Sequence, residues 1–566
     1  MARIRHIKIS NFRGIRELSW FPRPGLNCIV GPGDSGKSTV LDAIDLCLGA
    51  RRTTTFSDAD FHGMDVDNDI VIEVTVGDLA DNLKSMETYG HYLRNFDADE
   101  LTIDDEPESS GEVVLTLVLT ISADLEPVWT LKSERAPSES QRYLTWADRN
   151  SIAPMRLGNN AGQHMGWRRG SVLNRLSDEK TDAAEALATA ARAARQTFGD
   201  RVDTQLSKTL VKVAETARAL GVPADEGLRA LLDAHSVSFG SGVIALHDKN
   251  GVPLESLGTG SARLLSVGLQ RAASEQASIV VVDELEYGLE PHRIMRLLGS
   301  LGAKEQSSPL QGFLTTHSPV AVRELSSTQL FVMQRQEGVH FLVALPPEAQ
   351  GTVRRFPEAL LAASIIVCEG ASEVGFIRAI DRKTSESGRG LFASGLALVD
   401  AGGCSKIYGR ALPLADLGYR TAVFRDDDRQ PAASDEEAFI GKGGKVFKWR
   451  DGKAIEDELF EILSDGAVAL LLERAVALHG EELIEDQLSS ASGGKIKLAE
   501  CRASQNKEVR SLLARCAKSK ASWFKNVGDF EEMTVDIVLP DIKNWREDFT
   551  ALVVEMVKWA RVGKRD

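Results

Sequence analysis

The stretch GPGDSGKS, Gly31 to Ser38, decides the fold of the first half of this sequence. Its spacing of glycine, four residues, glycine, lysine and serine is typical of phosphate-binding loops. The apolar run 26–30 before it has the length of a buried strand, and apolar residues recur at helical spacing over 39–48. The sequence therefore predicts strand, loop and helix, with a glycine-rich turn that holds no ligand as the alternative.

The residue types in this loop suit phosphate chemistry. Glycines allow backbone N–H groups to turn toward phosphate oxygens, and the lysine brings positive charge to the outer phosphates. The serine hydroxyl can hold a magnesium ion at the start of the helix. The residues expected to bind ATP here are Gly31, Gly33, Ser35, Gly36, Lys37, Ser38 and Thr39.

Length and composition limit the class of protein. A chain of 566 residues is too long for one core and suggests about three or four folding units. No apolar run reaches the roughly 18 residues of a membrane span, and residues 1–12 alternate like a strand rather than a signal peptide. The six cysteines form no Cys-x-x-Cys pair, which argues against a disulfide framework or a zinc site. We expect a soluble cytoplasmic protein without membrane association.

The charge distribution bears on nucleic-acid binding. A formal net charge of −15 argues against a protein coated in nucleic acid, because phosphate backbones attract clustered Lys and Arg. The segment 495–525 nevertheless holds nine Lys and Arg residues against two Glu. Such a run is either a solvated helical face or a track for DNA.

The sequence around the loop predicts a larger sheet. Residues 3–9 read as a first strand, and the alternating runs 70–76 and 113–122 predict antiparallel strands that extend it. The acidic stretch between those two runs is expected to be a loop or arm.

A helical insertion is expected between two parts of this first domain. Residues 177–236 are rich in Ala, Leu, Glu and Arg at helical spacing, with interruptions at Gly199 and at 221–223 that suggest two or three helices. Such an insertion is either a dimerisation arm or a subdomain packed on its own head.

Three further motifs follow in order. The glycine-bearing turn in LESLGTGSARLL, residues 254–265, leads into a helix, and the apolar strand 278–282 ends in Asp283 and Glu284. Carboxylates at the end of a buried strand suit catalysis: Asp283 would reach magnesium and Glu284 would orient or deprotonate water. A last apolar segment ends at His317, which could sense the terminal phosphate.

This set of motifs resembles the ATPase head shared by ABC transporters, SMC proteins and RecF-type repair proteins, over about the first 345 residues. In that superfamily the glycine turn of one subunit, here Gly258, Gly260 and Ser261, closes over ATP held by the other, so the resemblance implies an ATP-dependent homodimer. The turn departs from the usual Leu-Ser-Gly-Gly-Gln, and no glutamine loop follows the first helix, which puts rapid turnover of ATP in doubt.

The second half of the sequence predicts a second sheet. Its three short apolar strands end in acids and glycines: 364–368 ends in Glu369 and Glu373, 396–399 ends in Asp400, and 421–424 ends in 426–428. Functional groups collect beyond the carboxyl ends of parallel strands, so Glu369 and the pair Asp426 and Asp428 should converge.

Clustered carboxylates need a cation to remain ionised together, and all-oxygen ligation favours Mg²⁺ or Mn²⁺. Two such ions can activate water and stabilise the leaving oxygen in phosphodiester cleavage. The alternative is a solvated turn at 426–428 and a Glu369 stabilised by a helix dipole.

This half resembles the Toprim domain of topoisomerases, primases and OLD-family nucleases (overcoming lysogenization defect). Glu369 matches the glutamate after the first Toprim strand, Asp426 and Asp428 match the later Asp-x-Asp, and Glu373 is the extra acid of the OLD type. The resemblance implies that these four acids bind metal, as Ser38 and Asp283 would in the head. An ABC-type head followed by Toprim is the OLD arrangement.

Two later residues complete the expected nuclease site. Glu456 is chosen over Glu458, because OLD-type domains often carry a late glutamate near the second metal. Lys525 could stabilise charge on the scissile phosphate, or it could be a helix-capping lysine beside core aromatics.

The expected fold is α/β: an ABC-type ATPase domain with an inserted helical arm, followed by a Toprim α/β domain with helical additions. The expected boundaries are 1–176 and 237–355 for the head, 177–236 for the insertion and 360–566 for the Toprim part. The sequence predicts an ATP-binding, Mg²⁺- or Mn²⁺-dependent DNA endonuclease, acting in phage defence or DNA processing.

Two alternatives compete with this prediction. One is a RecF- or SMC-like DNA-repair ATPase with a non-catalytic Toprim domain. The other is strand passage or primer synthesis, although neither Tyr408 nor Tyr419 has a context that supports a nucleophile.

Overall fold

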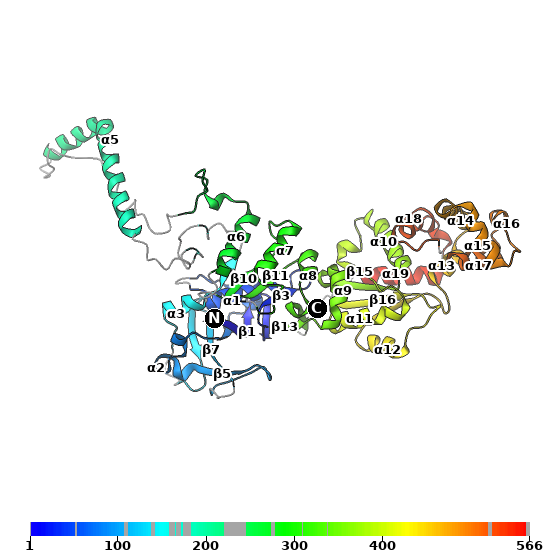
Figure 1. Ribbon diagram of the computed structural model, residues 1–566, viewed down its shortest axis with the longest axis horizontal. Coiled ribbons are helices and arrows are strands. Elements are labelled where there is room, and N and C mark those ends of the chain that lie inside the picture. Colours follow the sequence, from blue (N-terminus) through cyan, green and yellow to red (C-terminus); the bar gives the residue numbers. More distant parts are fainter. Residues whose placement is uncertain are drawn as a thin grey trace.

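The computed structural model describes residues 2–50, 54–106, 111–136, 142–157, 165, 171, 173, 183–219, 245–272, 278–307, 309–336, 338–518 and 523–561. It is elongated, with a long helix at one end, a large sheet in the middle and a smaller sheet followed by helices at the other end (Figure 1). Each sheet contains strands predicted by the sequence together with others that were not predicted.

Within the described ranges, the first sheet has thirteen strands in the order β6-β5-β7-β4-β1-β2-β13-β12-β3-β11-β10-β9, with β8 paired to β7. Their bounds are β1 Arg3–Phe12, β2 Ile15–Trp20, β3 Leu26–Val30, β4 Ile70–Gly77, β5 Leu93–Asp97, β6 Thr102–Asp104, β7 Glu112–Ile121, β8 Pro127–Lys132, β9 Met155–Leu157, β10 Ile279–Val282, β11 Gln311–Thr315, β12 Leu330–Gln336 and β13 Val339–Ala344.

This sheet has an antiparallel half and a parallel half. Strands β1, β4 and β7 are antiparallel neighbours, which confirms the extension predicted from the two alternating runs. Strands β3, β10 and β11 are buried along their whole length and pair in parallel, with β11 in the middle. Their carboxyl ends therefore meet at one edge, where the predicted nucleotide motifs follow.

One expectation about this sheet was wrong, since the acidic stretch expected as a loop or arm contains β5 and β6. Strand β2, which follows β1 after a short turn, was not predicted. Both segments lack a clear alternation of buried and exposed positions over their full length, so their pairing depends on neighbouring strands.

Helices of the first half lie around the sheet. Their bounds are α1 Lys37–Leu48, α2 Met86–Tyr89, α3 Trp146–Ile152, α6 Thr259–Ala272, α7 Pro291–Ser300, α8 Pro319–Glu324 and α9 Gln350–Arg355. Helix α1 is buried along most of its length, and Val40, Leu41 and Ile44, which recur at helical spacing, belong to the core of the sheet.

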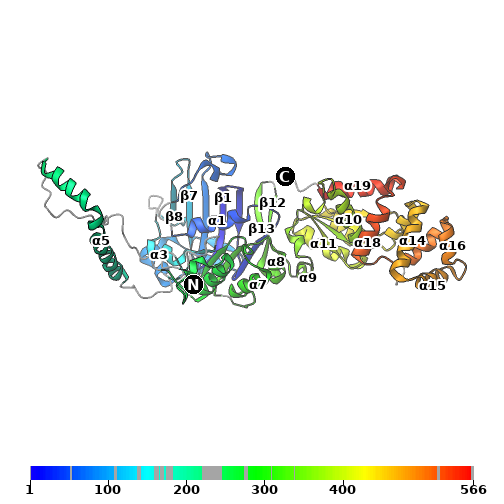
Figure 2. The same ribbon diagram turned by 90° about the horizontal axis from the view of Figure 1, so that it is seen from above.

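The inserted segment contains one long helix. Helix α5, Ala183–Ala219, runs through Gly199, so the predicted interruption there was wrong. An interior glycine costs a helix about 1 kcal/mol relative to alanine, which weakens a helix without ending it. The rest of the predicted insertion, 177–182 and 220–236, lies outside the described residues. In two perpendicular views α5 projects away from the sheet (Figures 1 and 2).

The second sheet is entirely parallel over the described residues. It comprises β14 Ser364–Cys368, β15 Leu396–Asp400, β16 Arg420–Arg425 and β17 Lys445–Lys448, in the order β15-β14-β16-β17. The three strands predicted in this half are confirmed. The helices between these strands are α10 Ala371–Ser385, α11 Ile407–Asp416 and α12 Ala433–Gly441.

A helical region follows the second sheet and shares a core with it. Its helices are α13 Ile455–Ile462, α14 Asp465–His479, α15 Glu481–Ser492, α16 Leu498–Ala503, α17 Lys507–Ala517, α18 Val527–Met533 and α19 Glu547–Arg561. The aromatic rings of Phe376, Trp449 and Phe549 pack together in this core and fix α10 and α19 against the sheet.

The two sheets are joined by one continuous apolar core. Leu314 and Val332 of the first sheet belong to the same buried cluster as Val367 and Val423 of the second. Polar contacts add to it, because the Gln334 side chain donates to the carbonyl of Leu417 and the Tyr419 hydroxyl donates to the carbonyl of Leu360 at 2.6 Å. The halves are therefore held together over a packed interface.

Candidate functional site

The phosphate-binding loop follows β3 and depends on glycine at two positions. Gly36 precedes α1 with φ of +90°, and Gly31 has φ of +139° with the Met333 backbone oxygen 3.3 Å from the place a Cβ would take. A side chain at either position would be strained. Nothing lies within 4 Å of such a Cβ at Gly33, so space alone does not require glycine there.

The Lys37 side chain lies inside this loop and donates hydrogen bonds to it. Its Nζ donates to the backbone oxygens of Gly31 at 3.2 Å and Pro32 at 2.6 Å, and to the Ser35 hydroxyl at 3.3 Å. Burial lowers the pKa of Lys37, although nearby Asp34 and Asp283 oppose that effect. The ammonium group therefore lies within the loop, where it can exchange these oxygens for phosphate oxygens.

Ser38 and Asp283 meet across the sheet edge. The Ser38 hydroxyl donates to the Asp283 carboxylate at 3.0 Å, and the Thr315 hydroxyl at the end of β11 donates to the same oxygen at 2.5 Å. A hydroxyl and a carboxylate side by side beside a phosphate loop are oxygen ligands of the kind that Mg²⁺ takes. The donor set thus fits the ion predicted for the head. Thr39 lies half-buried in the first turn of α1.

Glu284 is exposed beside Asp283 in a strained backbone conformation. Its φ is +46°, and its N–H donates to the Thr315 hydroxyl at 2.9 Å. The fully buried guanidinium of Arg263 in α6 holds this loop by donating to the backbone oxygens of Asp283, Glu284 and Tyr287 at 3.0, 3.1 and 2.8 Å. The side chain of Glu284 is left exposed at the surface.

Glu286 is a site residue that the sequence analysis missed. Its carboxylate accepts hydrogen bonds from the Thr316 hydroxyl at 2.5 Å and from the His317 N–H at 2.7 Å. The loops after β10 and β11 are therefore tied together, and His317 stands exposed at their junction. In the sequence, Glu286 stands two positions after Glu284, and the run Thr315, Thr316, His317 follows another predicted strand. These positions gave no stronger signal for the contact.

The glycine turn packs beside the acidic loop of its own chain. Gly260 lies so close to Gly288 that a Cβ would come within 2.6 Å of the Gly288 oxygen, and Arg293 donates to the Ser261 hydroxyl at 3.1 Å. Gly258 has open space around it. The turn is thus fixed at the start of α6 while its outer side remains free.

The second candidate site lies beyond β14 and β16. The Glu369 carboxylate accepts the Asp426 N–H at 3.1 Å, and its backbone oxygen accepts the Gly403 N–H at 2.8 Å. Two of the predicted ligands are therefore adjacent, and the glycine turn after β15 adjoins them. Asp400 is capped by the Gly402 N–H at 2.8 Å instead of joining the acids.

Three acids from three segments gather next to Glu369: Glu373 and Glu456 are buried, and Asp426 is half-buried. Glu373 in the first turn of α10 accepts the Gly370 N–H at 2.9 Å, and Asp426 accepts the Ile455 N–H at 2.9 Å. Glu456 in the first turn of α13 accepts the Ser372 hydroxyl at 3.4 Å. Among the described residues, no ion pair engages any of these carboxylates.

Their electrostatics show that they interact. Burial, together with the charges of Glu456 and Glu369, raises the pKa of Glu373 to about 8. Burial raises the pKa of Glu456 to about 7, and burial with the charges of Glu373, Glu456 and Glu369 raises the pKa of Asp426 well above its ordinary value. Buried carboxylates that repel one another create a demand for a cation.

The donor set fits a hard divalent cation, but its present arrangement does not form a metal cage. Within the described ranges, no three His, Cys, Asp or Glu side chains come close enough together to hold one ion. Asp428 is exposed, although its charge helps to raise the pKa of Glu369, for which burial is the main cause. The sequence predicted that the acids converge on one region, and Glu369 and Asp426 are adjacent as predicted. The described acids do not surround one common metal position.

The late residues Glu456, Glu458 and Lys525 have different surroundings. Glu458 is engaged by Arg450 and Arg546, each at 2.7 Å, whereas Glu456 has no such partner among the described residues. Lys525 is exposed beside the buried Trp523 and Phe524, and its charge lowers the pKa of Glu456 against the larger effect of burial.

The basic segment is partly neutralised within the chain. Arg502 pairs with Glu473 and Glu481, Arg510 pairs with Asp465, and Lys518 pairs with Asp457. Lys520 lies outside the described residues. Ion pairs within the chain account for these three side chains, and the segment is less cationic than its composition indicates.

Neither tyrosine considered for strand passage is available as a nucleophile. Tyr408 and Tyr419 are buried, with their hydroxyls bonded to Glu436 and to the Leu360 backbone oxygen. Burial is the first cause that raises the pKa of each.

The sheet and the loops at its edge define the first half of the chain as an α/β ATPase domain. Residues 26–323 match the family described as "AAA domain, putative AbiEii toxin, Type IV TA system", and the chain belongs to that family.

Individual relatives agree with this class. An "OLD nuclease" from Thermus scotoductus is 26% identical over 346 residues, which are 56% of this chain and 59% of that protein. A "DNA replication and repair protein RecF" from Prosthecochloris aestuarii is 47% identical over 55 residues, 9% of this chain and 15% of that protein. The match thus spans less than two thirds of either relative.

Solved structures of two ATPase heads are similar at low scores. An Smc head bound to the C-winged helix domain of ScpA gives a TM-score of 0.35 at 16% identity, covering 62% of this chain and 99% of that one. The structure of RecF with ATP gives a TM-score of 0.33 at 11% sequence identity, covering 60% of this chain and 99% of that one. Among the described helices, none has the length and apolarity needed to cross a lipid bilayer.

Proposed function

We propose that this protein is an ATP-binding, divalent-metal-dependent DNA endonuclease of the OLD type. The observation that carries the proposal is the convergence of the half-buried Glu369 and Asp426 with the buried Glu373 and Glu456 beyond the ends of parallel strands, without ion pairs among the described residues. The similarity to an OLD nuclease over about half the chain supports it.

The metal of this site would be Mg²⁺ or Mn²⁺, held by Glu369, Glu373, Asp426 and Asp428, with Glu456 as a further acid. When bound, such ions activate water and stabilise the leaving oxygen of a phosphodiester. The raised pKa of Glu373 supports this assignment, because a buried carboxyl that holds its proton near neutral pH exchanges it for a cation.

The chain's own side chains have separate tasks in this proposal. Lys525, exposed and within electrostatic reach of Glu456, would stabilise the charge that develops on the scissile phosphate. The four-stranded parallel sheet and its strand-end acids support a Toprim type for the second domain. The proposed boundaries remain 360–566 for this domain, with the head at 1–176 and 237–355 around the insertion at 177–236.

The head would bind ATP with magnesium. Lys37 would contact the outer phosphates, Ser38 and Asp283 would hold the ion, Glu284 would orient water and His317 would approach the terminal phosphate. A homodimer would place Gly258, Gly260 and Ser261 over the partner's ATP, and the projecting α5 suits an arm for self-association. We place the protein in the cytoplasm, with DNA as substrate, in phage defence or DNA processing.

The test is a nicking assay with supercoiled plasmid and Mg²⁺ or Mn²⁺. The native protein should nick, and Asp426→Ala should lose at least about 100-fold in rate, because metal ions supply several kcal/mol to such reactions. No nicking by the native protein, or equal nicking by the variant, would refute the proposal.

A second candidate is a RecF- or SMC-like repair ATPase with a non-catalytic second domain. The observation that favours it is that no three acids of the described residues are arranged to hold one ion. It predicts DNA binding that depends on ATP, with no strand breaks at any Mn²⁺ concentration.

A further inference from the structure

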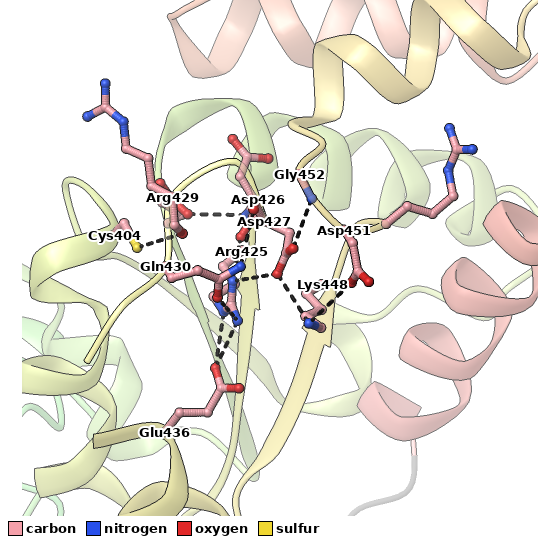
Figure 3. A network of polar contacts seen from close by, with 12 residues as sticks. Cys404, Arg425, Asp426, Asp427, Arg429, Gln430, Glu436, Lys448, Asp451 and Gly452 are labelled. Carbon is pink, nitrogen blue, oxygen red and sulfur yellow. Dashed lines mark hydrogen bonds and ion pairs between the residues drawn. The ribbon is translucent and has the colours of Figure 1, made fainter. Parts of the chain in front are cut away.

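Asp427 lies between the proposed ligands Asp426 and Asp428, yet it has a different environment from both. Its side chain is 3% exposed, whereas Asp428 is exposed. Figure 3 shows that its carboxylate lies within a network of polar contacts that joins β16 to the loop after β17. This residue therefore needs an explanation other than metal binding.

The Asp427 carboxylate is fully engaged. One oxygen accepts Arg425 Nη1 and Lys448 Nζ, each at 3.2 Å, and the other accepts the Gly452 N–H at 3.0 Å. The Asp427 carboxylate is therefore held by fixed partners from β16, β17 and the loop that follows β17.

Arg425 anchors the network from the opposite side. Its guanidinium is buried, donates to the Asp426 backbone oxygen at 2.8 Å and pairs with Glu436 of α12 at 3.0 Å. The Tyr408 hydroxyl of α11 donates to Glu436 in turn. Two helices thus fix the guanidinium, which fixes the end of β16.

The contacts of Asp427 reach the segment that carries Glu456. Its N–H donates to the Lys453 oxygen at 2.9 Å, so side chain and backbone together bind the loop 449–454 at two points. Helix α13 begins directly after this loop, and its Ile455 N–H donates to Asp426. The end of β16 and the start of α13 are therefore held at a fixed separation.

We propose that Asp427 is a positioning residue that sets the placement of Glu456 relative to Asp426, and thereby the fit of the acidic site to a divalent cation. The inference rests on the proposed nuclease function. In this role Asp427 does not bind the metal ion, and it acts through its contacts with the loop 449–454. Because outer contacts of this kind orient ligands, their loss commonly costs about 10- to 100-fold in metal affinity or activity.

The test uses the full-length protein and the variant Asp427→Asn, whose amide would present N–H groups to donors. Mn²⁺ binding is measured by the electron paramagnetic resonance of free Mn²⁺, and plasmid nicking is measured against Mn²⁺ concentration. Both midpoints should rise about 10- to 100-fold, while ATP binding at the head stays unchanged. The matched control is Asp451→Asn, since Asp451 is in the same loop with a side chain 97% exposed; its midpoints should stay within about twofold, as expected for a solvated side chain.

A second variant covers the case in which Asp427→Asn fails to fold. Lys448→Met removes one half-exposed donor to Asp427 and leaves Arg425 and Gly452 in place, so the Mn²⁺ midpoints should shift by about threefold, the effect of one modest charged contact. Native Mn²⁺ midpoints in both variants, or in Lys448→Met if the other does not fold, would overturn the positioning role while leaving nicking by the native protein intact. A native protein that neither binds Mn²⁺ nor nicks would refute the proposed function and this inference together.

Discussion

The Ser38 hydroxyl and the Asp283 carboxylate are 3.0 Å apart, although 245 positions separate them in the sequence. The contact joins the start of α1, which follows β3, to the end of β10. Strand β11 lies between β3 and β10 in the sheet. It brings together the two side chains that are proposed to hold a nucleotide-bound magnesium ion.

Lys37→Ala should weaken ATP binding about 10- to 100-fold, since a hydrogen bond to a charged group contributes about 1.5–3 kcal/mol. Binding is measured by titration with a fluorescent ATP analogue. Nicking without ATP should persist in part, because the acidic site is built from other elements. Loss of both nicking and the folded state in this variant would contradict the separation of the two sites.

Glu286→Gln tests the tie between the loops after β10 and β11. The variant should lower the rate of ATP hydrolysis by about tenfold while leaving ATP affinity unchanged, because one charge-assisted hydrogen bond that positions His317 is weakened. Steady-state hydrolysis and nucleotide titration are measured together. Glu305→Gln, at a surface pair with Arg271, is the control and should leave both unchanged. An equal loss of affinity and turnover would speak against a positioning role.

The raised pKa values predict a pH-dependent stability. In metal-free protein, folded Glu373 keeps its proton up to about pH 8, whereas the unfolded chain releases it near the ordinary value of 4.5. The folded state binds more protons over this window, so the free energy of unfolding should fall as pH rises from about 5 to about 8. Thermal unfolding in chelator measures this fall.

Mn²⁺ should reverse this trend, since a cation replaces the protons at the same carboxylates. The stabilisation by Mn²⁺ should therefore grow over the same pH window. Glu373→Gln should flatten the pH dependence in chelator and reduce the Mn²⁺ effect. A melting temperature that rises from about pH 5 to about pH 8 in chelator would contradict the electrostatics of the acidic site.

The shared core predicts that both sheets unfold together. Differential scanning calorimetry should give one transition, because the same buried cluster includes Leu314 and Val423. Tyr419→Phe removes one buried hydrogen bond to Leu360 and should lower the free energy of unfolding by about 1 kcal/mol without splitting that transition. Two separate transitions in the native protein would show that the halves fold independently.

Local patterns were enough to predict about half of the described strands and both groups of motifs. The strand 26–30 and the strand 364–368 are short apolar runs followed by chemically distinctive residues, and each is buried along its length. Because parallel strands end at one edge, the adjacency of Glu369 and Asp426 followed from the sequence.

Other features depend on contacts between distant segments. The sequence DDD gave no reason to separate Asp427 from its neighbours, since its burial comes from Arg425, Lys448 and Gly452. The continuation of α5 through Gly199 and the core shared by the sheets were missed for related reasons. A glycine lowers helix stability without dictating an end, and periodicity shows that a face is apolar without showing what covers it.

Cleavage of supercoiled plasmid in Mn²⁺ by the native protein and by Asp426→Ala tests the central claim most directly. We predict metal-dependent nicking by the native protein that chelator abolishes and that the variant lacks, while both bind ATP equally. Nicking that persists in Asp426→Ala, or none by a native protein that binds ATP, would contradict the account.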